Sequence, residues 1–198
     1  MGLGRVYVKQ RHRLTYDDWC EGIRTGRSYV SDGAHHLIDF RGSAVDAPKH
    51  SVEVGTGGSE LRLARAGVVR LRVRAAARQE KGDPAPVELI VNGYPVAKQL
   101  LPQDGQEREL VFETRVERSS WLALRMFPGA HTNPIWVVVD GRPVRASRRS
   151  AEWCLRGVDR CWKQKERTYA ESEREEARRA YEHARVAYRQ ILSETRPD

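Results

Sequence analysis

Residues 87–96 read VELIVNGYPV, and this stretch decides the fold. Two apolar runs flank Asn92-Gly93, a pair that readily takes the positive φ angles that a type I′ turn requires. The stretch is the strongest hairpin signal in the chain. It predicts two antiparallel strands joined by a two-residue turn.

Short apolar segments lie on both sides of this hairpin. The clearest is 69–74, in which apolar residues alternate with Arg70, Arg72 and Arg74. Such alternation is typical of a half-buried strand. Further strands are expected at 37–40, 61–63, 110–112, 121–127 and 135–139. Their number and their Gly/Pro punctuation are typical of a β-sandwich, which we predict over residues 32–148.

The N-terminal segment has a different pattern. An alternating strand is expected at 5–9, followed by a helix that Thr15 can cap and Gly26 can end. A short strand at 28–30 follows. Residues 1–31 are therefore predicted to form a strand–helix–strand piece.

After residue 149 the apolar period becomes helical. Ala177, Tyr181, Ala184, Tyr188 and Ile191 follow 4-3-4-3 spacing, which predicts a packed helix face. Residues 149–198 are expected to be a helical extension. The predicted fold class is α+β: mainly an antiparallel β-sandwich, with a short N-terminal strand–helix piece and a C-terminal helical extension.

The bulk composition favours a cytoplasmic protein that does not enter the membrane. The mean hydropathy is −0.67, and no apolar run approaches the roughly 20 residues that a membrane helix needs. The net charge of +8 is dispersed along the chain, which usually serves solubility. We therefore expect no specific binding to nucleic acid. The three cysteines have no paired spacing and are expected to be reduced.

The most metal-like cluster is Asp32, His35 and His36. Adjacent residues of a strand point to opposite faces, so the two histidines should diverge. The remaining histidines are isolated, and no H-x-H or H-E-x-x-H motif is present. We therefore assign no catalytic and no metal-binding residue in this chain.

Four residues are candidates for ligand binding: His131, Asn133, Trp121 and His35. His131 and Asn133 lie in the turn before Pro134, where they could present hydrogen-bond donors at one end of the sandwich. The same turn could equally be a strand entry whose polar side chains bind their own backbone. The residues alone leave both interpretations open.

Several segments together resemble one known family. Residues 4–9 (GRVYVK), 16–26 and 26–33 (GRSYVSDG) look like the end of the catalytic domain in metallohydrolases of the CehA/McbA type. These enzymes belong to the PHP (polymerase and histidinol phosphatase) superfamily. Residues 87–93, 118–125 (RSSWLALR) and 131–135 (HTNPI) resemble the β-rich region after that domain, and 145–147 and 150–155 its C-terminal extension.

The resemblance implies a metal-dependent hydrolase whose His, Asp and Glu ligands all lie upstream of the strand that residues 5–9 resemble. This chain would then be the non-catalytic C-terminal portion, packing on a catalytic barrel and shaping the edge of its active site. The divalent metal would belong to the full-length protein, so no cofactor is expected here. The expected partner is a PHP-like domain, upstream or in trans, with self-association through the exposed N-terminal strand as another option. The alternative function is a standalone β-sandwich module that binds carbohydrate or protein.

Overall fold

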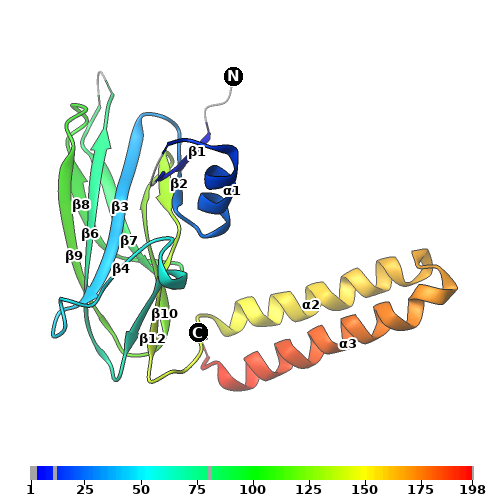
Figure 1. Cartoon of the computed structure of the whole chain (residues 1–198). Helices are drawn as coiled ribbons and strands as arrows, with labels where there is room; N and C mark the ends of the chain where they lie inside the picture. Colours follow the sequence, from blue (N-terminus) through cyan, green and yellow to red (C-terminus); the bar gives the residue numbers. More distant parts are fainter. Residues whose placement is uncertain (1–3, 11–12, 80–81, 198) are drawn as a thin grey trace. The chain divides into compact units, whose positions relative to one another are not determined.

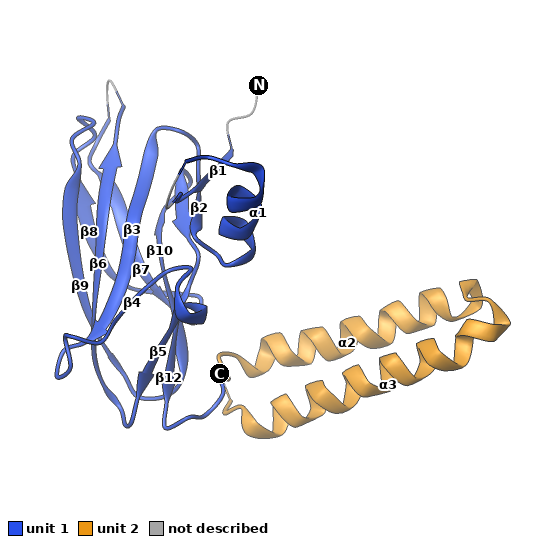
Figure 2. Cartoon of the chain, viewed as in Figure 1, with its two compact units in different colours: residues 1–144 blue, residues 145–198 orange. Residues whose placement is uncertain are grey.

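The computed structural model describes residues 4–10, 13–79 and 82–197, and it divides the chain into two units, 1–144 and 145–198 (Figure 2). The first unit contains two sheets and one helix, and the second contains two long helices. The predicted α+β class, with a mainly antiparallel sandwich, is confirmed.

One sheet has the strand order β4-β3-β6-β9. Its strands are β3 (His35–Ala44), β4 (Ser51–Glu53), β6 (Gly67–Ala77) and β9 (Arg108–Val116). The other sheet has the order β1-β2-β11-β10-β12-β5, and β7 and β8 extend from the opposite edge of β10 (Figure 1). Its strands are β1 (Arg5–Val8), β2 (Ser28–Ser31), β5 (Glu60–Leu63), β7 (Ala85–Val91), β8 (Tyr94–Leu101), β10 (Ser120–Met126), β11 (Ala130–Thr132) and β12 (Ile135–Val139). The pairing of β12 with β5 is parallel, and the other pairings of the described strands are antiparallel.

The predicted hairpin is present as β7 and β8. Asn92 and Gly93 have φ angles of 52° and 95°, and Val91 pairs with Tyr94 across the turn. Positive φ at both central positions is the geometry that the Asn-Gly pair was expected to supply.

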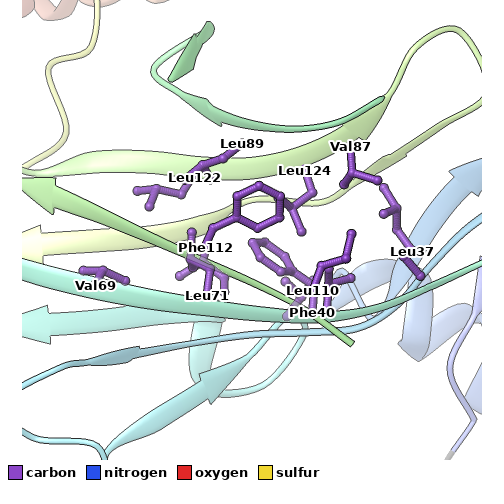
Figure 3. Close-up of a cluster of buried hydrophobic side chains, with 14 of the residues drawn as sticks. Leu37, Phe40, Val69, Leu71, Val87, Leu89, Leu110, Phe112, Leu122 and Leu124 are labelled. Atoms are coloured by element: carbon purple, nitrogen blue, oxygen red, sulfur yellow. The ribbon is translucent and has the colours of Figure 1, made fainter. Parts of the chain in front are cut away.

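The core lies between the two sheets. Figure 3 shows side chains of β3, β6 and β9 pointing toward those of β7 and β10. Leu71 and Phe112 from one sheet are buried, as are Leu122 and Leu124 from the other. Each buried leucine of this kind contributes about 1.5–3 kcal/mol to folding through loss of water contact. These alternating inward side chains are why the sequence pattern identified the strands.

The N-terminal piece consists of β1, α1 (Tyr16–Arg24) and β2. The Thr15 hydroxyl accepts a hydrogen bond from the Asp18 backbone N–H at 3.1 Å, and Gly26, at φ 80°, follows the helix end. Strand β2 pairs with β11, a short strand that the sequence did not indicate. The N-terminal piece is therefore continuous with a sheet of the sandwich.

The second unit is an antiparallel helical hairpin of α2 (Arg148–Lys165) and α3 (Glu171–Glu194), with one 3-10 turn, η2 (Glu166–Thr168), between them. Trp162 packs its ring against Tyr181 at a centroid distance of 5.1 Å, and Arg185 pairs with Asp159 at 2.7 Å. The three cysteines are free. Neither these helices nor α1 combines the length and apolar character needed to cross a bilayer, in the part of the chain that is described.

Candidate functional site

Two of the four candidate residues lie on the same face of one sheet. Trp121 on β10 is directly opposite Trp136 on β12, and His131 on β11 is opposite Arg125. Because Arg125 is four residues along β10 from Trp121, His131 and Trp121 lie about 13 Å apart along the strand. Trp136 is 39% exposed. The two tryptophans are paired in register across β10 and β12, and His131 lies away from them.

Asn133 has a different location and an internal set of partners. Its Nδ2 group donates to the Gly26 and Ser28 carbonyl oxygens and contacts the Ser28 hydroxyl, each at 3.1 Å. These partners lie in the turn after α1 and at the first residue of β2, more than 100 residues earlier in the chain. Asn133 therefore ties the N-terminal piece to the sandwich.

His35 is held at the start of β3. Its Nδ1 lies 2.8 Å from Asp32 Oδ2, and its Nε2 lies 3.2 Å from Gln103 Oε1. Burial would raise the pKa of Asp32, but hydrogen bonds from the Ala34 and His35 backbone and the His35 ring lower it. The side-chain partners of His35 are therefore Asp32 and Gln103, and none of the other three candidate residues is among them.

The neighbouring His36 points elsewhere and bonds the Tyr29 hydroxyl at 2.8 Å through Nδ1. Throughout 4–10, 13–79 and 82–197, no three His, Cys, Asp or Glu side chains converge as a metal site requires.

The arginines of β6 are matched by carboxylates on their own sheet. Arg70 pairs with Glu113 at 2.7 Å and Arg72 with Glu109 at 3.0 Å. Arg62, which lies in β5 of the other sheet, pairs with Glu60. This arrangement disperses the positive charge instead of presenting it as one surface to a phosphate backbone.

A cavity of about 230 Å³ lies where β1 and β2 face β3 and the end of β4. Its lining comes from the N-terminal piece, from β3 and β4, and from Thr132 of β11. The lining residues are Tyr7, Val8, Lys9, Arg27, Ser28, Tyr29, Leu37, Ile38, Asp39, Phe40, Glu53, Val54 and Thr132. None of the four candidate residues lines the cavity, although the lining residue Thr132 lies between His131 and Asn133 in the sequence.

Aromatic rings form one wall of this cavity. Tyr7 and Tyr29, paired across β1 and β2, stack with ring centroids 5.2 Å apart and planes 11° apart. His36 meets the Tyr7 ring edge-on at 5.0 Å. Burial raises the pKa of Tyr29 to about 12.

Ion pairs form another part of the lining. Lys9 Nζ bonds both Asp39 and Glu53, and Arg74 Nη2 bonds Asp39 at 2.6 Å. Asp39 has φ 55° at a bulge in β3, a left-handed conformation that Asp and Asn tolerate. Burial would raise the pKa of Asp39, but the hydrogen bonds from Lys9 and Arg74 outweigh it and lower that pKa. For Lys9, burial lowers the pKa, but its bonds to Asp39 and Glu53 outweigh this and raise it.

Replacing Asp39 by Asn should make the stability less dependent on pH. Because the pKa of Asp39 is lowered in the folded state, its ionised carboxylate stabilises the fold above the unfolded-state pKa of about 3.9. This stabilisation is lost as the pH falls through the folded-state pKa. Asp39→Asn should therefore cost about 1–3 kcal/mol at pH 7 and much less near pH 2. Urea unfolding at both pH values measures this difference. Asp140→Asn is the matched control, because Asp140 has φ 54° but an exposed side chain; an equal loss in both variants would contradict the assignment.

Gly55, next to the lining residue Val54, packs against Arg27 of the N-terminal piece. It has φ 80°, and a methyl group at this position would lie 2.5 Å from the Arg27 backbone nitrogen. Gly55 is therefore packed on Arg27, whereas Gly57, in the following 3-10 turn η1 (Gly57–Ser59), has nothing within 4 Å of an added methyl group. Sequence reasoning placed Tyr7, Lys9 and Tyr29 in strands, but their meeting with Asp39 depends on pairings that no local pattern reveals.

The chain matches no known protein family in a scan against family models, and a search of curated proteins likewise found no significant match.

Proposed function

We propose that this chain is the non-catalytic, C-terminal portion of a PHP-type metal-dependent hydrolase and docks on the catalytic barrel through β1 and α1. The observation that carries the proposal is the unpaired edge of strand β1 in the N-terminal piece. Among the described residues β1 pairs only with β2, so its other edge has backbone groups free for a further strand.

The N-terminal piece also carries exposed apolar side chains. Val6 on β1 is 50% exposed, Tyr16 at the start of α1 is 78% exposed, and Trp19 and Ile23 on the same helix are also exposed. Apolar side chains that gather on one short piece of chain are typical of a protein–protein contact. A tryptophan is a frequent source of binding energy in such contacts. The resemblance of residues 4–33 to the end of a PHP-type catalytic domain supports a barrel as the partner.

The test is association in trans. The chain is mixed with a CehA/McbA-type barrel domain lacking its own C-terminal region, and binding is measured by calorimetry. We expect saturable binding that Trp19→Asp weakens by about 30-fold, the effect of losing a central interface residue. Leu100→Asp is the matched control, because Leu100 is exposed on β8 and should leave binding unchanged.

Two outcomes would overturn the proposal. One is the absence of binding, or equal binding by the Trp19→Asp variant. The other is a dimer of the chain alone, seen by sedimentation and dissolved by Trp19→Asp, because the same surface would then serve self-association.

A further inference from the structure

The cavity between the N-terminal piece and the sandwich has the chemistry of a ligand site that is separate from the docking surface. Its lining includes two cations, Lys9 and Arg27, and two anions, Asp39 and Glu53. A bound anion would face both carboxylates, and a bound cation would face both basic groups. The lining therefore favours a ligand without net charge.

The charged groups still offer directed hydrogen bonds. Lys9 and its two carboxylate partners are held in place by one another, which fixes donors and acceptors side by side. The Nε atom of Arg27 is buried and has no hydrogen-bond partner in the described part of the chain. Because this atom is closed to the cavity as well as to solvent, the polar contacts open to a ligand are those of Lys9, Asp39 and Glu53. Hydroxyl groups suit this wall, because each can both donate and accept.

The aromatic part of the lining suits the carbon skeleton of the same ligand. The stacked rings of Tyr7 and Tyr29 offer apolar surface, and the nearly buried Phe40 and Val54 also line the cavity. The cavity volume of about 230 Å³ is slightly below the range of about 300–1,000 Å³ for drug-sized ligands. It therefore has room for a single small ring and not for an extended chain.

We propose that this cavity binds a single neutral sugar or cyclitol ring, whose hydroxyls contact Lys9, Asp39 and Glu53 and whose C–H face packs on Tyr7 and Tyr29. The site involves neither Trp19 nor the free edge of β1. The failure of either proposal, ligand binding in the cavity or docking on a catalytic barrel, would therefore leave the other one unaffected.

The experiment is an NMR titration of the whole chain with ¹³C-labelled tyrosine. The neutral probes are methyl α-glucoside, methyl α-mannoside, methyl β-galactoside, N-acetylglucosamine and myo-inositol, and the charged probes are acetate and methylammonium. At least one neutral probe should shift the Tyr7 and Tyr29 signals in a saturable way. Half-saturation is expected at about millimolar concentration, the range for a ligand of roughly a dozen atoms.

Two variants locate the binding. Tyr7→Leu removes one aromatic face, and Glu53→Gln removes one acceptor charge at a partly exposed position. Each should raise the half-saturating concentration by about fivefold or more. Tyr94→Leu is the matched control, because Tyr94 is exposed at the β7–β8 turn and does not line the cavity. The amide signals of residues 69–73 report whether each variant keeps its sandwich.

Three results would overturn the proposal. The first is no saturable shift of the Tyr29 signal with any neutral probe up to about 100 mM, far above the range expected for this ligand size. The second is saturation by acetate or methylammonium instead. The third is sugar binding that folded Tyr7→Leu and Glu53→Gln variants leave unchanged, which would place the sugar elsewhere, for example on Trp121 and Trp136.

Discussion

Gly55→Ala should lower the free energy of unfolding of the first unit by about 3 kcal/mol. Two effects add: alanine at φ 80° costs about 1 kcal/mol or more, and overpacking costs a further 1–3 kcal/mol, roughly. The added methyl group would lie 2.5 Å from the Arg27 nitrogen and 2.6 Å from its Cα. Backbone atoms cannot rotate away as a side chain would. The loop must therefore separate from the N-terminal piece.

Gly57→Ala is the matched control for this prediction. Gly57 lies in the same segment at φ 54°, but nothing lies within 4 Å of an added methyl group. It should cost only the conformational term of about 1 kcal/mol. Urea unfolding gives both free energies, and hydrogen exchange should show faster opening of β2 in the Gly55→Ala variant alone. Equal losses in the two variants would show that Gly55 is not packed on Arg27.

Asn133→Asp should lower the free energy of unfolding by about 2–3 kcal/mol at pH 7, the cost of placing a charge among partly buried carbonyl groups that lose their donor. The change replaces the donor Nδ2 by an acceptor that faces the carbonyl oxygens of Gly26 and Ser28. Those oxygens disfavour the ionised carboxylate, so the pKa of the introduced group should be raised in the folded state. The introduced carboxyl group imposes no such penalty below the unfolded-state pKa of about 3.9. Stability is lost as the pH rises from there through the raised folded-state pKa of the group. The penalty should therefore shrink below about pH 4.

Asn133→Ala separates charge from the loss of the donor. It should cost about 1–2 kcal/mol, with no dependence on pH arising from residue 133. Urea unfolding of both variants at pH 4 and pH 7 measures the difference, and hydrogen exchange at 28–31 reports whether β2 loosens. A pH-independent loss in Asn133→Asp would contradict the proposed contact with the two carbonyl oxygens.

Local patterns were enough to predict much of the fold. Asn92-Gly93 formed its hairpin turn, Thr15 capped its helix, and the alternating stretch at 69–74 lies within β6. Each of these features depends on residues that are close in sequence: a turn conformation, a capping hydrogen bond, or side chains that alternate between two faces. The apolar period after residue 149 likewise predicted helices, because a helix repeats its face over a few residues.

The short strands were harder to predict. β4 and β11 have three residues each, too few for a period to be visible. β11 becomes a strand because it is hydrogen-bonded between β10 and β2, whose partner residues come from distant parts of the chain. Its existence is a consequence of tertiary structure and has no local cause.

The sequence by itself determined the fold class, the hairpin and the helical extension, because local geometry and the burial pattern of each segment specify them. Only the tertiary structure decided what the polar residues do. It gave Asn133 its partners at Gly26 and Ser28, and it brought Lys9 to Asp39, 30 residues away. The physical reason is that side-chain partners depend on which strands pair and in which register. Those pairings are settled by the packing of the whole sandwich, not by any single segment.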